Sequence, residues 1–177
     1  MADKLQFDIT NFRNIFKTAA RTYLFYVTPQ FPIQVSTSPP TNIYLVKASS
    51  LPSSTFEEVT TSMQQSDFKS AGKRSYDNWN VTFYVDINAT LRKTFNKWLD
   101  TIVDPITGYH GYPKDYMMDQ KVTLLGINKK EIMTYTMTWA YPTSVGETTL
   151  DYANIDFATF DVSFAYQTFT TTSTSGW

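Results

Sequence analysis

Few side chains in the sequence have the types and spacing that catalysis requires. His110, the one histidine, stands between two nearby glycines, and no serine lies close to it in a nucleophile pattern. Glu57 and Glu58 are adjacent in a segment that alternates weakly like a strand, which points their carboxylates to opposite faces. Two carboxylates arranged in this way are poorly placed to share acid and base roles at one bond. The sequence therefore predicts no catalytic residue and no enzyme.

Metal and cofactor sites are not indicated either. The chain has no cysteine and a single histidine, which excludes thiolate clusters and multi-histidine sites. Asp151, Asp156 and Asp161 do not have the spacing of an EF-hand loop, so surface or turn roles are expected for them. The six glycines are scattered and form no phosphate-binding loop. We predict no cofactor and no metal.

Two other groups of side chains could contact partners. They are Lys69, Lys73 and Arg74, and Tyr109, Tyr112 and Tyr116. The basic group is either a solvated face or a set of ion-pair partners for acidic residues of a neighbouring subunit. The tyrosine group could stack on nucleic-acid bases, but little positive charge lies near it. Protein–protein packing is therefore the favoured role of the tyrosines.

The elements that position these residues are mostly strands. Trp79, Val81, Phe83 and Val85 alternate with Asn, Thr, Tyr and Asp, which predicts a half-buried strand. An amphipathic helix is expected over 88–102, with Asn88 as its N-cap and one apolar stripe that packs on a sheet. The stripe consists of Leu91, Phe95, Trp98, Leu99 and Ile102.

Weaker patterns predict the other elements. A short N-terminal helix is expected over 11–20, where Phe12, Ile15, Phe16 and Ala19 share a face. Strands are expected over 23–28, 42–48, 57–63, 121–127, 132–141 and 158–166. Loops are expected over 29–41, 64–73 and 103–118, and the stretch 168–177 is an uncharged Thr/Ser-rich C-terminal tail.

Alternation within 132–141 separates a bulky face, which includes Trp139, from a small neutral face. The small face consists of Thr134, Thr136, Thr138 and Ala140. Large aromatic side chains at the inward positions of the strands and the helix are expected to anchor the core. The predicted anchors are Trp79, Phe83, Phe95, Trp98, Trp139 and Phe160.

These elements predict a mainly β (α+β) fold, an antiparallel sandwich or barrel with one flanking helix, in a single domain over 1–177. A net charge of −1 does not suit general nucleic-acid binding. Charged residues make up 18% and aromatic residues 16% of the chain, and its 27 threonines favour strands and a self-associating surface. The first residues have no apolar signal region, so folding in a cytoplasm is expected.

The segment Ala71–Val85, AGKRSYDNWNVTFYV, resembles the tail tube proteins of contractile-tailed bacteriophages. In that family a small residue and Gly, a basic residue, an aromatic, an acid and a Trp open an alternating strand, and an amphipathic helix follows. Further likeness lies in YPTSVGE over 141–147, LDY over 150–152 and TFDV over 159–162. These motifs follow the family order, and the resemblance extends over about residues 12–167.

This resemblance implies a structural virion protein with a β-sandwich barrel fold and a helix on its flank. The family builds hexameric rings that stack into the inner tube of a contractile tail, the conduit for genome ejection. Implied partners are further copies of the chain, the tail sheath, the baseplate or tube initiator, the tail terminator and the tape-measure protein. DNA would pass through the lumen without specific binding. Assembly in the host cytoplasm and a final location in the virion tail are expected.

Stacking of rings requires an element that reaches the next ring. The candidates are Glu57, Glu58, Lys69, Lys73 and Arg74. The face of Thr134, Thr136 and Thr138 is a candidate lumen or inter-subunit wall, because a neutral wall would not hold phosphates. The nearest alternative is the inner tube of a phage-related contractile injection system that delivers proteins. A baseplate or tube-initiator paralogue and a monomeric ligand-binding sandwich that uses the tyrosine loop are further alternatives.

Overall fold

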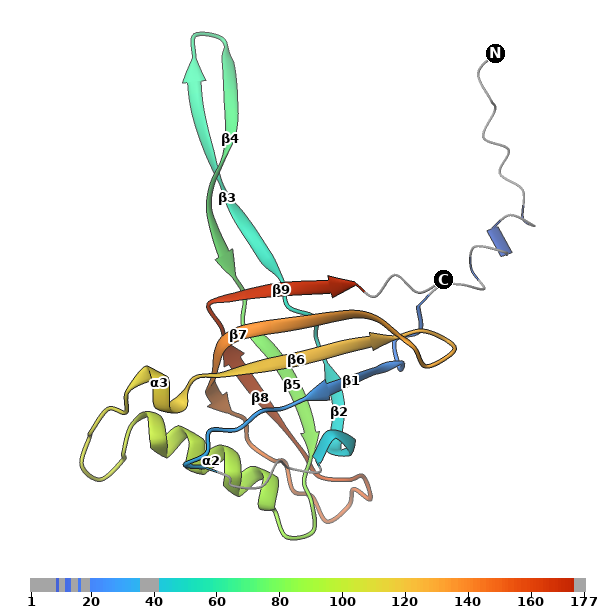
Figure 1. Cartoon of the computed structure of the whole chain (residues 1–177), viewed down its shortest axis with the longest axis vertical. Helices are drawn as coiled ribbons and strands as arrows, with labels where there is room; N and C mark the ends of the chain where they lie inside the picture. The colour runs from blue at the N-terminus through green and yellow to red at the C-terminus, as the bar shows by residue number, and fades with distance from the viewer. Residues whose placement is uncertain (1–8, 10–11, 14–15, 17–19, 36–41, 174–177) are drawn as a thin grey trace.

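Antiparallel strands dominate the structure, a computed structural model that describes residues 9, 12–13, 16, 20–35 and 42–173. In chain order the elements are β1 (Phe25–Thr28), η1 (Asn42–Leu45), β2 (Val46–Ser49), β3 (Ser54–Met63), β4 (Ser66–Tyr76), β5 (Trp79–Tyr84), α2 (Thr90–Ile102), α3 (Pro113–Tyr116), β6 (Met118–Leu125), β7 (Glu131–Val145), β8 (Thr159–Ala165) and β9 (Thr168–Ser173) (Figure 1). The helix predicted over 11–20 lies mostly outside the described residues.

The long strand β7 joins two sheets. Its first part pairs with β6 and β9, and β1 continues that sheet at the far side of β6. Its last part pairs with β8, which leads on to β5 and then β2. The four-stranded sheet β1–β6–β7–β9 therefore lies in front of the β8–β5–β2 strands in Figure 1. The predicted class, mainly antiparallel β with one flanking helix, is confirmed.

The core fills the space between the two sheets and is rich in aromatic side chains. Trp79, Phe83 and Phe160 are at most 1% exposed, and the Phe83 and Phe160 rings stack with centroids 5.7 Å apart. The indole N–H of Trp79 donates to the carbonyl oxygen of Ser50 at 2.8 Å. Burial of an indole is favourable when its polar N–H keeps such a partner.

Helix α2 closes one end of this core with the stripe that its sequence predicts. Leu91, Phe95 and Trp98 are buried, and the rings of Phe95 and Trp98 stack at 6.2 Å. The Trp98 indole N–H donates to the backbone oxygen of Tyr116 at 2.7 Å, which ties α2 to α3. Phe31 packs on both rings, with centroids 5.1 Å from Phe95 and 5.4 Å from Trp98.

Phe31 belongs to the segment 29–41, which the sequence predicts as a loop, and its described part 29–35 is folded onto the core. A fully buried side chain, Gln120 of β6, fixes this segment. Its amide oxygen accepts from the backbone N–H of Gln30 at 3.1 Å, and its amide nitrogen donates to the Gln30 carbonyl at 2.8 Å. A buried amide with both groups paired avoids the desolvation cost of an unsatisfied polar atom.

The predicted N-cap of α2 is wrong. The helix begins at Thr90 and not at Asn88, and the N-cap position is Ala89, with φ of 51°. The carboxylate of Asp86 accepts the first helical amides instead, from Thr90 at 3.0 Å and from Leu91 at 3.2 Å. The left-handed residue Ala89 turns the chain so that the carboxylate of Asp86, three residues upstream, reaches these N–H groups.

The predicted loop over 64–73 is also wrong, because residues 66–76 form β4. This strand pairs with β3 over its whole length, and the two residues Gln64 and Gln65 make the turn. Gln64 has φ of 52°, a left-handed conformation that Gly or Asn adopts more often in hairpin turns. The sequence Gln64-Gln65 therefore does not indicate a turn. Gly72 lies so close to β3 that a Cβ there would be 2.8 Å from Cγ2 of Val59.

The prediction that Trp139 is a core anchor is wrong, because its side chain is exposed. Two residues of β7, Thr138 and Trp139, lie opposite the single residue Asp119 of β6, which is a β-bulge. Trp139 has φ of 56°, and its backbone N–H donates to the carboxylate of Asp119 at 3.0 Å. The bulge reverses the alternation, so that Ala140 is buried and Trp139 is 57% exposed.

Three further segments differ from their predicted form. Residues 42–45 form a 3-10 helix, and β2 spans 46–49, so that only 46–48 of the predicted strand 42–48 are extended. The predicted loop over 103–118 contains α3. The Thr/Ser-rich stretch contains β9, whose strand pairs with β7 from Thr168 to Ser173.

Candidate functional site

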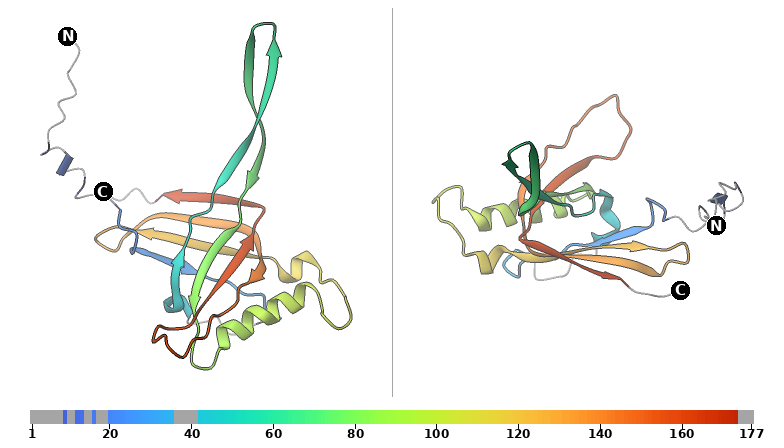
Figure 2. Two further views of the ribbon diagram at one scale, coloured as in Figure 1. Left: turned by 180° about the vertical axis from the view of Figure 1, so that it is seen from behind. Right: turned by 90° about the horizontal axis from the view of Figure 1, so that it is seen from above.

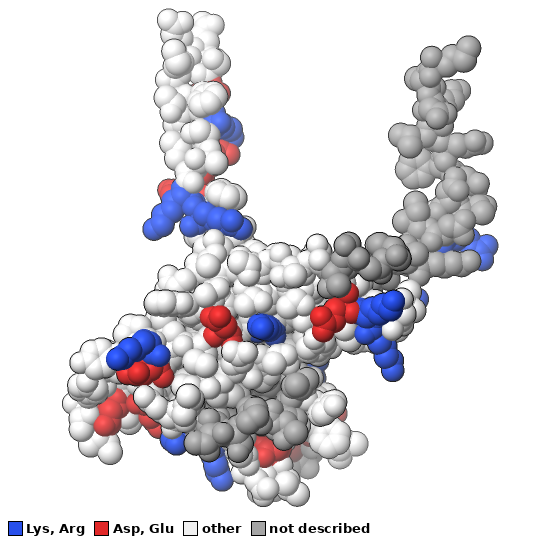
Figure 3. All heavy atoms as spheres, in the orientation of Figure 1, with Lys and Arg blue, Asp and Glu red and all other residues white. Residues whose placement is uncertain are grey.

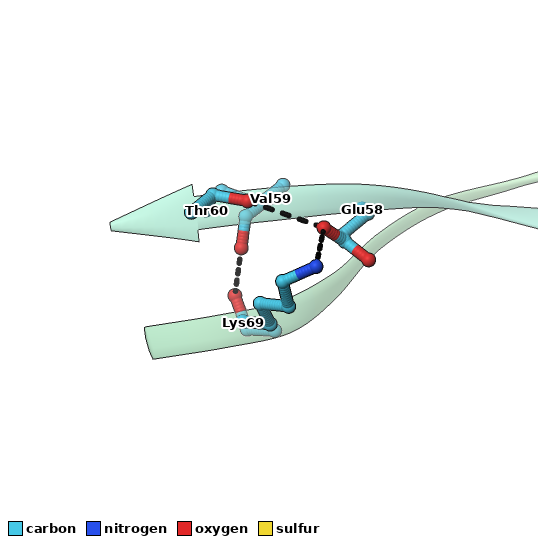
Figure 4. A network of polar contacts seen from close by, with 5 residues as sticks. Glu58, Val59, Thr60 and Lys69 are labelled. Atoms are coloured by element: carbon cyan, nitrogen blue, oxygen red, sulfur yellow. Dashed lines mark hydrogen bonds and ion pairs between the residues drawn. The ribbon is translucent and has the colours of Figure 1, made fainter. Parts of the chain in front are cut away.

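The most prominent surface feature is the hairpin of β3 and β4, which stands away from the body of the molecule (Figures 1 and 2). All five charged residues predicted for ring stacking lie on this hairpin and are exposed. Lys69 Nζ is 2.8 Å from the Glu58 carboxylate, which also accepts from the Thr60 hydroxyl at 3.3 Å (Figure 4). Glu58 and Lys69 therefore link the two strands on one side of the hairpin.

The root of the hairpin is held by Arg74. Its guanidinium lies over the rings of Phe56, Tyr76 and Phe169, at 5.5, 5.2 and 5.7 Å from their centroids. It also donates to the Ser54 hydroxyl at 2.9 Å. Because Phe169 belongs to β9, this cluster attaches the hairpin to the four-stranded sheet. Arg74 is thus a structural contact of the hairpin root.

The hairpin beyond this root has little charge and exposes apolar side chains. No charged residue occurs from Val59 to Ser66, and Figure 3 shows the outer end of the hairpin without coloured charges. Beyond the root the exposed apolar residues are Val59, Met63 and Phe68, whereas the exposed Phe56 belongs to the root cluster. A two-stranded ribbon with such side chains has no face buried against its own chain.

A second surface is the outer face of the four-stranded sheet. Thr134, Thr136 and Thr138 of β7 lie opposite Thr172, Thr170 and Thr168 of β9. On the other side of β7, the Thr134 hydroxyl is 3.0 Å from that of Thr123 in β6. This face of the sheet is turned toward the viewer in Figure 1, and Figure 3 shows separate basic and acidic side chains of both signs across it. Lys121 of β6, opposite Thr136, lies on the same face. Sequence reasoning missed the contribution of β9, although the alternation of Phe169 with threonines is a strand signal.

The edges of this sheet are strands β1 and β9. Each pairs with one neighbour within the described part of the chain, β1 with β6 and β9 with β7. Unpaired backbone groups on an edge strand are a template for pairing with another chain. Among the described strands the sheet therefore has two open edges, on opposite sides.

A third surface was not predicted as a site. The segment 146–158 between β7 and β8 and the turn before α2 expose several large apolar side chains. These are Ile87, Leu150, Tyr152, Ile155 and Phe157. A hollow of about 390 Å³ beside the segment is lined by Lys47 and by the acids Glu147, Asp151, Asp156 and Asp161. Three of these acids are in the segment itself, which has no Lys or Arg.

The residues considered for chemistry do not come together. His110 is exposed in the connection between α2 and α3, where it bridges to Val103. Tyr109 and Tyr112 are exposed, whereas Tyr116 packs edge-on against Tyr141 with centroids 5.7 Å apart. Among the described residues no group of three or more His, Cys, Asp or Glu could hold a metal ion.

The clear pKa shifts in the described residues raise the pKa of tyrosines and lower the pKa of aspartates, so none moves a group toward titration at neutral pH. The hydrogen bond from the Tyr26 hydroxyl to Glu131, 2.5 Å long, raises the pKa of Tyr26, and burial raises the pKa of Tyr166. Amide hydrogen bonds, first that of Ile106, lower the pKa of the Asp104 carboxyl. No helix in the described ranges is long and apolar enough to span a membrane.

A projecting hairpin, a threonine-rich sheet face and two edges that are open among the described strands are features typical of one class of protein, the structural β subunit that pairs with further copies. The chain matches the family described as phage tail tube protein over residues 6–172. It therefore belongs to the phage tail tube protein family and is a component of the virion.

Individual relatives agree with this membership. The tail tube proteins gp19 of Enterobacteria phages T6 and T4 are each 27% identical over 140 residues, which span 76% of this chain and 85% of the relative. The fold is similar to that of a chain in the anti-feeding prophage baseplate, with a TM-score of 0.69, 16% identity and coverage of 88% and 97%. A chain of the sheath–tube complex of the PVC extracellular contractile injection system gives a TM-score of 0.63, 14% identity and coverage of 88% and 93%.

Proposed function

We propose that the chain forms hexameric rings that stack into the inner tube of a contractile phage tail, the conduit for genome ejection. The observation that carries this proposal is the four-stranded sheet, with rows of threonines on its outer face and two edges that are open among the described strands. Pairing of β9 in one copy with β1 in the next would continue the sheet around a ring and remove both edges. The family match over 6–172 supports one tail-tube domain over 1–177.

The threonine face would line the lumen in this arrangement. Thr134, Thr136 and Thr138 present hydroxyl and methyl groups, which offer passing DNA no array of cations. Each phosphate neutralised by a Lys or Arg strengthens binding, so a conduit functions better with a neutral wall. DNA and the tape-measure protein would pass without specific binding.

The hairpin of β3 and β4 would then connect one ring to the next. Glu57, Glu58, Lys69 and Lys73 are on a ribbon that leaves the body along the longest axis of the molecule (Figure 1). Further partners would be the sheath around the tube, the baseplate or tube initiator, and the tail terminator. Solved structures of similar fold come from the baseplate, the sheath–tube complex and the terminator of contractile injection systems, which supports these partners. We propose a structural role and no enzymatic one.

Electron microscopy and sedimentation velocity of the purified full-length chain test the proposal. We expect rings of six copies and stacked tubes with a central channel, and a cryo-EM map should place β1 beside β9 of the adjacent copy. A stable monomer that forms neither rings nor tubes at high concentration, even with its baseplate present, would contradict it.

A second function is favoured by one observation, the similarity in fold to the anti-feeding prophage and PVC chains. The same ring-building subunit could form the inner tube of an injection system that delivers proteins. Neighbouring genes distinguish the two, since capsid and terminase genes accompany a phage tail and toxin genes accompany an injection system. The likeness to gp19 of phages T4 and T6 favours the phage tail.

A further inference from the structure

The hairpin has an apolar outer part that its own chain leaves uncovered. Met63 is 70%, Phe68 66% and Val59 46% exposed. A ribbon of two strands is marginally stable in water unless a third strand, a helix or another surface packs on it. A partner with an apolar surface is therefore required to bury this ribbon.

A matching surface lies at the other end of the molecule. Within the segment 146–158, Leu150 is 82%, Ile155 100% and Phe157 85% exposed. The segment keeps a definite shape through local hydrogen bonds, such as that from the Ala153 N–H to the Asp151 carboxylate at 2.9 Å. Phe157 also contacts the Tyr84 ring edge-on, with centroids 6.2 Å apart. These apolar groups are thus displayed on an ordered loop.

The positions of the two surfaces suit a head-to-tail contact. In Figure 1 the hairpin leaves one end of the longest axis, and the segment 146–158 lies at the opposite end. Both are behind the four-stranded sheet when the molecule is viewed along that axis in Figure 2. A second copy displaced along the axis would bring its 146–158 segment beside the hairpin of the first. Such a contact between unlike surfaces can repeat without closing.

The charges of the two surfaces are also complementary. The described residues contain one ion pair, Lys69 with Glu58. Near the hairpin root, Lys73 and Arg74 stand beside the acids Glu57 and Asp77. The segment 146–158 contains Glu147, Asp151 and Asp156 and no cation. Placing Lys73 and Arg74 opposite the loop acids would favour the head-to-tail orientation, whereas loop against loop would bring like charges together.

We propose that the segment 146–158, with the turn at Ile87, is the surface that receives the β3–β4 hairpin of a copy in the adjacent ring. This inference rests on the proposed stacking of rings and names the partner surface of the hairpin. The outer apolar residues of the hairpin pack among Leu150, Tyr152, Ile155 and Phe157. The loop acids lie toward Lys73 and Arg74 of the copy that they receive.

Disulfide cross-linking tests this assignment, because the chain contains no cysteine. We would introduce Met63→Cys at the hairpin tip together with Tyr152→Cys in the loop of the full-length chain and oxidise the assembled protein. Stacking links each copy to the next ring, so denaturing gels should show an open ladder of cross-linked chains. The matched control combines Met63→Cys with Ile127→Cys, which is exposed in the β6–β7 turn, outside the segment 146–158. This control pair should give no ladder.

A second pair of variants measures the energetic role of the loop. Ile155→Ser with Leu150→Ser should leave rings intact and abolish sedimentable tubes, whereas Ile127→Ser should leave both unchanged. Tubes without cross-links, or tubes that withstand the two loop substitutions, would overturn the inference and leave the loop free for a surrounding protein. Cross-linked products that stop at the size of one ring would overturn it in favour of a lateral contact. If the unaltered chain forms no rings, the proposed function itself fails, and the inference fails with it.

Discussion

Two tryptophans show how differently the same side chain can be used at two places in this fold. Trp98 is fully buried, stacks on Phe95 and donates its indole N–H to Tyr116. Trp139 is exposed at a bulge, and its backbone has a left-handed conformation that costs roughly 1–3 kcal/mol for a residue with a Cβ. Side-chain identity alone does not separate these roles.

The replacement Trp98→Ala should lower the free energy of unfolding of the unassembled chain by about 3–5 kcal/mol, because it leaves a cavity in the aromatic core. Trp139→Ala is the matched control and should change that free energy by less than about 1 kcal/mol. Urea denaturation followed by far-ultraviolet circular dichroism measures both without relying on indole fluorescence. Equal losses for the two variants would mean that Trp139 is a core anchor after all.

At the scale of elements, α2 depends on a side chain outside the helix. Partial burial acts to raise the pKa of Asp86, but the amide hydrogen bonds from Thr90 and Leu91 outweigh it, so that the pKa lies below its usual value. A carboxylate whose pKa is lowered on folding stabilises the fold above its unfolded pKa of about 4. This contribution is lost as the pH falls through the folded pKa.

Replacing Asp86 by Ala should therefore cost roughly 0.5–2 kcal/mol at neutral pH, as the loss of a helix cap does. The difference from the unaltered chain should shrink below about pH 4, where the carboxyl becomes protonated. The control is Asp100→Ala on the exposed side of the same helix, which should have little effect or stabilise slightly, since an acid near a helix C-terminus is unfavourable. A loss for Asp86→Ala that is independent of pH would contradict the capping role.

The hairpin of β3 and β4 is the element that local sequence patterns predict least well. Residues on both strands are almost all exposed, so neither strand has the alternation of a half-buried sheet. Its strand pairing nevertheless extends from Ser54 opposite Tyr76 to Met63 opposite Ser66. A strand without a buried face in its own chain is typical of an element that packs on another copy.

At the scale of the whole molecule, three sets of groups are left uncovered within the described part of the isolated chain, and we propose that other copies cover them. They are the edges of β1 and β9, the apolar outer hairpin, and the segment 146–158. Assembly that buries these groups stabilises the folded chain by mass action, because the unfolded chain does not bind.

The midpoint of thermal unfolding should therefore rise with protein concentration across the range in which rings and tubes form. Scanning calorimetry at several concentrations, matched to sedimentation velocity at the same concentrations, measures this dependence. The control is the double variant Ile155→Ser with Leu150→Ser, which should form rings but no tubes. Its unfolding midpoint should therefore rise less with protein concentration than that of the unaltered chain. A midpoint that stays constant while assembly occurs would show that assembly adds nothing to the stability of the fold.

The sequence by itself determined the elements that bury a face within the chain. The alternation that begins at Trp79 and the stripe of Leu91, Phe95 and Trp98 predicted β5 and α2, and the ordered motifs indicated the family. These patterns are local because burial repeats every two residues in a strand and about every 3.6 in a helix.

The tertiary structure decided the features in which distant residues meet. The bulge opposite Asp119 moves Trp139 out of the core by shifting the alternation of β7 by one residue, and nothing in the local pattern reports that shift. Pairing with β7 turns the Thr/Ser-rich stretch into β9 and completes the threonine face. The same holds for the candidate assembly surfaces: the charged residues were visible in the sequence, but their position on a projecting ribbon followed only from the pairing of β3 with β4.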